Sequence, residues 1–262
     1  MNSPAQPLPS VSVEVRDLRK SFHGKPVLKG IKLKVAPGEI FAIMGPSGSG
    51  KSVLLKHIIG LMEPDSGEVF IQGESIAAPG IRDNYRMAMV FQSGALLTSL
   101  NVAENVGIYL TEHLMRPPEE IARIVSAQLE AVGLKGVEEQ MPNELSGGMQ
   151  KRVAIARALI MDPQLILFDE PTSELDPLMA AVVGGEILKL KGRTQATAIV
   201  VTHDRELAFG IADRMAMMAG GEILFVGTPE EIKRSPDPRI HEFTYARLPT
   251  SHVPPKRNLE PT

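Results

Sequence analysis

An eight-residue segment combines glycines, a lysine and a serine at a spacing suited to phosphate binding. It reads Gly45-Pro46-Ser47-Gly48-Ser49-Gly50-Lys51-Ser52 and fits the pattern G-x-x-x-x-G-K-[ST]. Glycines let backbone N–H groups turn inward on phosphate oxygens, where side chains would collide. Lys51 is then placed to reach the outer phosphates of a nucleoside triphosphate, and the Ser52 hydroxyl to coordinate Mg²⁺.

A pair of acidic residues supplies the second half of such chemistry. Asp169 and Glu170 directly follow the apolar run 165–168. A carboxylate at the C-terminal end of a buried strand can hold a Mg²⁺-bound water, and a second one beside it can act as general base on an attacking water. Alone, such a pair usually marks a solvated turn. Downstream of a phosphate-binding loop, it predicts hydrolysis of a phosphate bond.

Strand and helix patterns indicate how the chain positions these two segments. Continuous apolar runs at residues 40–44, 165–168 and 198–201 predict strands covered on both faces. The first run ends at the glycine-rich segment, and apolar residues at helical spacing follow it over 52–61. The glycine-rich segment therefore lies between a buried strand and a helix, as a phosphate-binding loop requires.

The remaining patterns predict an α/β fold. Alternating residues at 11–15 and 31–35 indicate half-buried antiparallel strands, and the stretch from about Gln92 to Met161 is mainly helical in pattern. We expect a P-loop NTPase core with a parallel sheet, an antiparallel β subdomain and an inserted helical subdomain. The expected boundaries are a flexible N-terminus over 1–10, an ATPase domain over 11–247 with its helical subdomain at about 93–161, and a flexible tail over 248–262.

Composition excludes several classes of protein. The 262 residues carry 28 basic and 31 acidic side chains, a net charge of −3, which gives no electrostatic bias toward nucleic acid. Cysteine is absent, so disulfides and thiol chemistry are excluded. No apolar run approaches the about 20 residues that a bilayer span needs, and no signal peptide is visible. We expect a protein that reaches a membrane only through a partner.

Further motifs resemble those of ATP-binding-cassette ATPases, in the family's order. Leu145-Ser146-Gly147-Gly148-Met149-Gln150 is similar to the family's signature motif. Phe22, Gln92 and His203 stand at the positions of the adenine-stacking aromatic residue, the Q-loop glutamine and the switch histidine. Residues 173–176 match the D-loop. The resemblance covers about residues 11–235.

The resemblance implies ATP and Mg²⁺ as cofactors and a role for each matching residue. Its catalytic residues are Glu170, His203, Gln92 and Lys51. Its metal-binding residues are Ser52, Gln92 and Asp169. Nucleotide contacts fall to Phe22 and to the segment from Gly45 to Ser52. Ser146, Gly147 and Gly148 would bind the γ-phosphate of ATP held by a second copy of the chain, in a head-to-tail dimer.

Two residues depart from the family pattern. Glu174 stands in the D-loop where a small residue is usual, so the geometry of this loop near the dimer interface is open. Met149 stands where glutamine is commonest in the signature motif. Ser146 and both glycines are intact, and we expect the contact with the γ-phosphate to survive.

Several stretches resemble one subgroup, the Mla/Mce-associated phospholipid-transport ATPases. They include Met149 and residues 51–56, 91–96, 129–134 and 235–240. The similarity implies phospholipid transport between envelope membranes through separate integral membrane permease subunits, on the cytoplasmic face of the inner membrane, with a possible lipid-binding substrate protein.

The alternatives are an importer ATPase for a small polar solute and a non-transport regulatory cassette of the cell envelope. A DNA-repair type of cassette is disfavoured, because the interval between Gln92 and Ser146 carries no heptad pattern.

Overall fold

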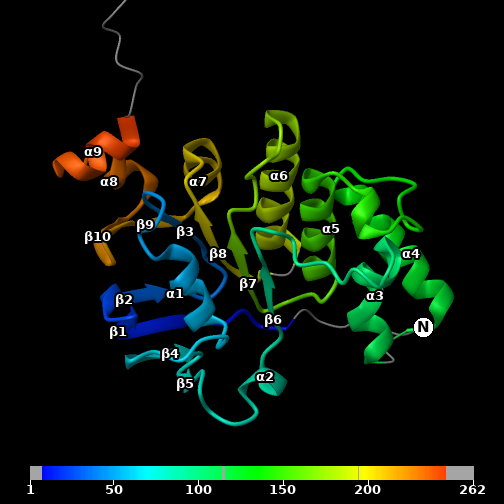
Figure 1. Ribbon diagram of the computed structural model, residues 1–262, viewed down its shortest axis with the longest axis horizontal. Helices are drawn as coiled ribbons and strands as arrows, with labels where there is room; N and C mark the ends of the chain where they lie inside the picture. Colours follow the sequence, from blue (N-terminus) through cyan, green and yellow to red (C-terminus); the bar gives the residue numbers. More distant parts are fainter. Residues whose placement is uncertain (1–7, 114–115, 194, 246–262) are drawn as a thin grey trace, which may run out of the picture.

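A six-stranded sheet forms the centre of the protein in the computed structural model, which describes residues 8–113, 116–193 and 195–245. All neighbouring strands run parallel except β9 and β10, which are antiparallel at one edge of the sheet. The order across the sheet is β10 (Glu222–Gly227), β9 (Arg214–Ala219), β3 (Ile40–Met44), β8 (Thr197–Thr202), β7 (Leu165–Asp169) and β6 (Met87–Val90). The predicted parallel core is therefore present (Figure 1).

An antiparallel four-stranded sheet lies beside the core sheet (Figure 1). Val13 pairs with Val35 on one side and with Ile71 on the other, and all three side chains are buried. The alternating valines thus face inward, as predicted for half-buried strands. The strand order is β2 (Lys25–Val35), β1 (Val13–Phe22), β4 (Ser66–Ile71) and β5 (Glu74–Ser75).

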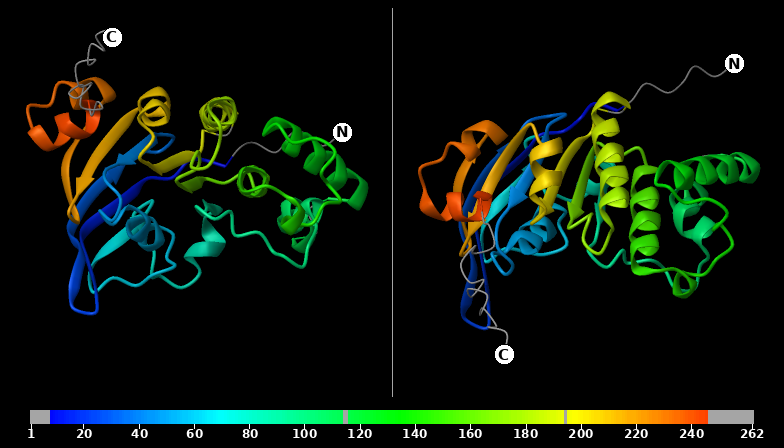
Figure 2. Two further views of the ribbon diagram at one scale, coloured as in Figure 1. Left: turned by 45° about the horizontal axis from the view of Figure 1, so that its top comes forward. Right: turned by 90° about the horizontal axis from the view of Figure 1, so that it is seen from above.

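Helices cover the core sheet, and three more helices lie together at one end of the molecule. α3, α4 and α5 gather away from the antiparallel sheet, while α6 and α7 lie beside the core strands (Figures 1 and 2). The helices are α1 (Lys51–Ile58), α2 (Ile81–Asn84), α3 (Val102–Glu112), α4 (Pro118–Ala131), α5 (Gly147–Leu159), α6 (Pro177–Arg193), α7 (Arg205–Ile211), α8 (Pro229–Lys233) and α9 (Pro238–Tyr245). Within the described ranges, no helix has both the length and the apolar character to cross a bilayer.

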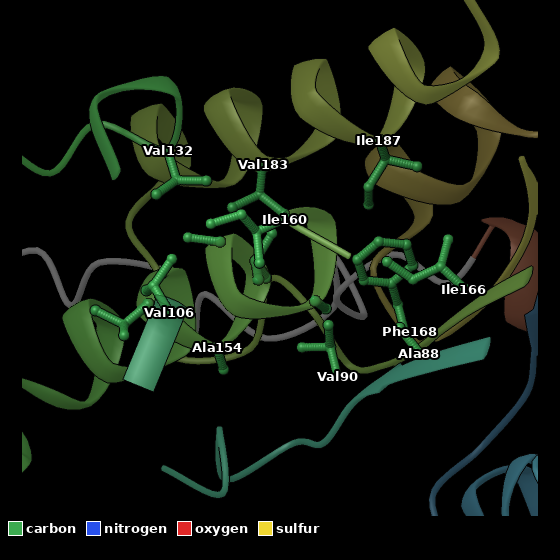
Figure 3. Packing of buried hydrophobic residues seen from close by; sticks show 14 of the residues in the cluster. Ala88, Val90, Val106, Val132, Ala154, Ile160, Ile166, Phe168, Val183 and Ile187 are labelled. Atoms are coloured by element: carbon green, nitrogen blue, oxygen red, sulfur yellow. The ribbon is translucent and has the colours of Figure 1, made fainter. Parts of the chain in front are cut away.

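Two apolar clusters bury the strand that carries the acidic pair. Ile166 and Phe168 pack with α5 and α6, whereas Leu165 and Leu167 belong to the cluster shared with the antiparallel sheet and α1. Figure 3 shows Phe168 beside Ile166 and Ile187. Because both faces of β7 are held, the residues at its carboxyl end have a rigid support.

Part of the stretch predicted as helical is a loop. Residues 92–101 form turns and extended backbone, and α3 begins only after Asn101, which caps it in a capping box with Glu104. Asn105 is buried and its amide donates to the carbonyls of Leu97, Leu100 and Asn101. One side chain therefore satisfies loop carbonyls that a helix would otherwise pair.

The predicted loose ends fall mostly outside the described residues. The expected tail over 248–262 lies wholly beyond them, as do residues 1–7 of the N-terminal segment. Next to the start of the described chain, Pro9 O accepts a hydrogen bond of 2.8 Å from Gln164 Nε2. This part of the N-terminal segment is thus attached to the core.

Candidate active site

The phosphate-binding loop needs glycine at two positions for steric reasons. A Cβ atom at Gly45 would lie 1.9 Å from Met218 O. Gly50 has φ 100°, and a Cβ there would come within 3.0 Å of Val27 O. The loop is thus pressed against the backbone near the end of β9, at Met218, and near the start of β2, at Val27, where a side chain would collide.

The N-terminus of α1 is available to an anion. Gly50 is its N-cap and provides no side-chain cap, so the first-turn N–H groups have no side-chain acceptor there. Lys51 is 7% exposed, and its Nζ donates to Gly45 O at 2.8 Å and to Pro46 O at 3.1 Å. Burial lowers the pKa of the Lys51 ammonium, against the attraction of Glu170 and Asp169. Ser49 Oγ is buried and has no hydrogen-bond partner among the residues that the structure describes.

Asp169 and Ser52 form a pair of oxygen ligands. The Ser52 hydroxyl donates to Asp169 Oδ1 at 2.8 Å. Burial raises the pKa of Asp169, although the hydrogen bond from Ser52 opposes this. A buried carboxylate beside a hydroxyl suits a hard cation such as Mg²⁺. No cluster of three or more His, Cys, Asp or Glu residues suited to a metal occurs in the described part of the chain, so phosphate or water oxygens would complete the coordination.

Glu170 is held against His203 across two neighbouring strand ends. Its Oε2 lies 2.8 Å from His203 Nδ1 and accepts from the His203 N–H at 3.2 Å. The Thr202 hydroxyl donates to the same oxygen at 3.3 Å. A carboxylate in these contacts has a defined direction, which a general base needs.

One cavity of about 340 Å³ brings half of the predicted residues together. Its lining comes from the glycine-rich loop, the start of α1, and the chain just after β6, β7 and β8. The lining residues are Val27, Ser47, Gly48, Gly50, Lys51, Ser52, Val53, Gln92, Glu170 and His203. Asp169 is reached through Ser52. Five separate parts of the sequence, with Val27 of β2 as one of them, thus converge on one site.

Gly45, Pro46 and Ser49 of the glycine-rich loop do not line this cavity, and neither do Phe22 and the signature motif. Phe22 is at the end of β1, 37% exposed, with Lys20 Nζ 5.8 Å from its ring centroid. Ser146 caps α5, where its Oγ accepts from the Met149 N–H at 3.3 Å. Gly147 lines a separate cavity of about 580 Å³ that also contains Gln92, Ser52 and Asp169. Gly148 follows it at the start of α5.

Glu174 lies next to the signature motif. Its backbone is left-handed, with φ 68°, and its Oε2 is 3.2 Å from the position of a Cβ on Gly147. Met149 packs against the apolar cluster of α5. Both residues that depart from the family pattern therefore lie at the N-terminal end of α5. Glu174 contacts it from outside, and Met149 packs on its core side.

Sequence reasoning missed two residues of this region. Val27 lines the first cavity, but nothing in its residue type distinguishes it from other strand valines. Lys151 is 2% exposed and bonds to the turn after Asp169. It lies three and four positions before the buried residues Ala154 and Ile155. This spacing places Lys151 on the apolar face of the helix, and it could have predicted a buried lysine.

A family model and curated proteins match the chain. The family model described as "ABC transporter" matches residues 28–173. The intermembrane phospholipid transport system ATP-binding protein MlaF of Escherichia coli is 41% identical over 88% of this chain and 87% of its own length. The Arabidopsis thaliana protein TRIGALACTOSYLDIACYLGLYCEROL 3, chloroplastic, is 41% identical over 91% of this chain and 74% of its own length.

A further relative and a solved structure extend this similarity. The probable ribonucleotide transport ATP-binding protein mkl of Mycobacterium leprae is 38% identical over 90% of this chain and 70% of its length. A solved dimer of the ATP-binding cassette MJ0796, bound to ADP and Pi, has a TM-score of 0.77 and 32% identity over 83% of this chain and 98% of that one. The chain belongs to the ABC transporter family and is an ATP-hydrolysing cassette of that family.

Proposed function

We propose that this cassette hydrolyses ATP at the cavity between the glycine-rich loop and Glu170. The observation that carries the proposal is the convergence of Lys51, Gln92, Glu170 and His203 on that cavity. Lys51 offers positive charge to the outer phosphates, and His203 lies beside the base. Glu170 accepts a proton from the attacking water.

The side chains at the proposed ATP site are suited to binding Mg²⁺. Ser52 and Asp169 provide adjacent hard oxygen atoms, and Gln92 lines both cavities that Ser52 lines. Bound there, the cation would neutralise charge on the phosphate oxygens. Ser52 and Asp169 would hold it, and Gln92 would reach it and the attacking water.

Replacing Glu170 tests the assignment of the base. A Glu170→Gln variant retains the shape of the side chain and loses its ability to accept a proton. We expect turnover to fall by about 10²- to 10⁴-fold, the usual contribution of a general base, while the dissociation constant for ATP changes little. Steady-state ATPase rates and equilibrium ATP binding measure the two effects. Wild-type turnover in this variant would remove Glu170 from the role.

We infer further that the chain works as one of two copies beneath a membrane permease. The solved MJ0796 cassette is a dimer, and the relatives' names place them in transport systems. In a head-to-tail pair, Ser146, Gly147 and Gly148 of one copy would contact the phosphate bound by the other. The membrane attachment would then run through the permease, at the cytoplasmic face of an inner membrane.

We infer phospholipid as the cargo. MlaF is named for intermembrane phospholipid transport, and it matches at 41% identity over most of both chains. The mkl protein, named for probable ribonucleotide transport, matches at 38% and keeps a small polar solute as a second candidate. A lipid-binding substrate protein is the accessory subunit that the first cargo requires.

Stimulation of the assembled transporter distinguishes the two cargoes. The chain is purified with its permease from native membranes and placed in nanodiscs of phosphatidylethanolamine and phosphatidylglycerol. We expect phospholipid delivered by a copurifying lipid-binding protein to raise the ATPase rate, with the Glu170→Gln variant as control. Stimulation by ribonucleotides, and not by lipid, would overturn the phospholipid assignment and favour the polar solute.

A further inference from the structure

Lys151 is a buried cation to which ATP hydrolysis gives no direct role. It is the fifth residue of α5, and only 2% of it is exposed. Its ammonium donates to Glu170 O at 3.3 Å, to Ser173 O at 2.7 Å and to the Ser173 hydroxyl. Three N–H donors thus meet three acceptors, and all three acceptors belong to the turn that begins with the proposed base.

That turn holds Glu170 in an unusual backbone conformation. The φ angle of Glu170 is 51°, in the left-handed region that residues other than glycine rarely adopt. Its carbonyl also accepts from the Ser173 N–H at 3.2 Å and from the Ser173 hydroxyl at 3.1 Å. The conformation is therefore held by contacts to the carbonyl, and Lys151 provides the charged one.

Within the described chain, burial of this ammonium is not offset by a direct ion pair with a carboxylate. Its hydrogen-bond acceptors are carbonyl and hydroxyl oxygens. Burial lowers the pKa of Lys151, while the charges of Glu174, Glu170 and Asp169 act in the opposite direction. A buried ammonium held by neutral oxygens loses more hydration than it regains from them. A stability role alone would be served as well by an apolar side chain of similar length.

The same helix also holds the loop that carries Gln92. Arg157, six residues further along α5, donates to Gly94 O at 3.1 Å and to Ala95 O at 2.9 Å. α5 thus binds the loop after β6 through Arg157 and the turn after β7 through Lys151. Its first residue follows Ser146, the signature serine.

We propose that Lys151 is a positioning residue for ATP hydrolysis, which holds the Glu170–Ser173 turn on helix α5 so that the Glu170 carboxylate stays directed at His203. The proposal rests on Glu170 being the base. A movement of α5 would reach that carboxylate through the Lys151 ammonium. Lys151, which binds the turn, and Arg157, which binds the loop of Gln92, then move together with the signature motif as one rigid helix.

A Lys151→Met variant tests this, because methionine keeps the length and apolar stem without the donors. We expect kcat to fall about 10- to 100-fold, the size of effect that a small misplacement of a catalytic group produces. KM and the dissociation constant for ATP are expected to stay within about threefold of wild type, because Lys151 does not line the nucleotide cavity. A Lys151→Arg variant restores donors and should recover part of the rate.

Arg152→Met is the matched control. Arg152 is the next residue of α5, and its Nη1 donates to the carbonyls of Val132 and Gly133 without touching the Glu170 turn. We expect it to lower the melting temperature without lowering kcat. Equal losses of kcat in the Lys151→Met and Arg152→Met variants would assign Lys151 a purely structural role and overturn the proposal.

Two further variants keep the result decisive. Should Lys151→Met not fold, Ser173→Ala removes one acceptor of Lys151 and should lower kcat severalfold at constant KM; wild-type kcat would overturn the proposal. Glu170→Gln separates this proposal from the proposed function. Full turnover in Glu170→Gln refutes the base assignment, whereas an inactive Glu170→Gln beside a wild-type rate in Lys151→Met refutes the positioning role alone.

Discussion

Lys51 and Lys151 face the same physical problem at two places in the molecule. Each is nearly inaccessible to solvent, at 7% and 2% exposure, and lies within the first two turns of a helix. Burial lowers the pKa of both ammonium groups. Each is held by backbone carbonyls of a tight turn rather than by a carboxylate. Burial and a shifted pKa alone would not distinguish their roles.

Their acceptors and their access to a cavity do distinguish them. The ammonium of Lys51 has two carbonyl acceptors, so one N–H remains for a ligand, and the residue lines the 340 Å³ cavity. Lys151 has three acceptors in one turn and lies outside that cavity. An incomplete set of acceptors beside a cavity indicates ligand binding, whereas a complete set within the fold indicates support of a neighbouring residue.

Within this comparison of the two lysines, the largest expected effect is that of Lys51→Met. This variant loses a charge-assisted hydrogen bond to phosphate, so we expect ATP affinity to fall about 10- to 100-fold, equivalent to about 1.5–3 kcal/mol. The rate with saturating ATP should fall by about 10²-fold or more, because the same donor faces developing charge. Isothermal titration with ATP and steady-state kinetics measure both. Lys51→Met with normal affinity, or Lys151→Met with lost affinity, would break the comparison.

Asp169→Asn exposes the cost of a buried charge in the same site. Burial raises the pKa of Asp169 above its ordinary 3.8. The folded protein therefore binds this proton more tightly than the unfolded chain, and stability is lost as pH rises through the raised pKa. The amide in the variant does not titrate, so it has no such loss, and its oxygen still accepts from the Ser52 hydroxyl. Above the raised pKa we expect the melting temperature of the variant to exceed that of wild type, and thermal unfolding at pH 7 measures the difference.

The control for this variant lies in its pH and Mg²⁺ dependence. The gain should disappear below about pH 4, where the carboxyl is protonated in both states. Stabilisation of the protein by Mg²⁺ with ATP should be weaker in Asp169→Asn than in wild type, because one oxygen ligand has lost its charge. A variant less stable than wild type at pH 7 would show that the Asp169 carboxylate stabilises the fold.

Patterns that are local in sequence predicted much of this architecture. The continuous apolar run at 40–44 coincides with β3, and the glycine-rich loop leads into α1 as its pattern requires. Both signals depend on neighbours within a few residues, namely apolar runs and the steric freedom of glycine. The motif order also predicted that Lys51, Gln92, Glu170 and His203 belong to one site, and all four line the same cavity.

Features that depend on distant contacts were not predictable in this way. Residues 92–101, part of the stretch predicted as mainly helical, form a loop whose carbonyls accept from the buried Asn105 amide. The lysine at 151 could be placed on a buried helix face, but its acceptors lie 19 and 22 positions away in sequence. The left-handed backbone of Glu170 has no sequence signal either, since it is imposed by contacts around its carbonyl.

The smallest effect concerns His57, a third buried group that can carry positive charge. It lies in α1 at 1% exposure, with Nδ1 2.7 Å from Val53 O. Burial lowers the pKa of the imidazole below its ordinary 6.5, despite the hydrogen bond to Val53. Unlike the two lysines, the imidazole can meet this cost by staying neutral at physiological pH.

This neutrality predicts a pH dependence of stability. The unfolded chain binds the His57 proton more tightly, so stability is present above about pH 6.5 and is lost as pH falls through the lowered pKa. In His57→Gln, the fall in melting temperature between pH 7.5 and 5.5 should be smaller than in wild type, because glutamine does not titrate. Measurements at pH 8.5 provide the reference, where the difference between the proteins reflects packing alone. If the melting temperatures of both proteins fall equally as pH decreases, α1 accommodates a charged imidazole. His57 would then carry a buried charge as the two lysines do, and the contrast drawn between them would be wrong.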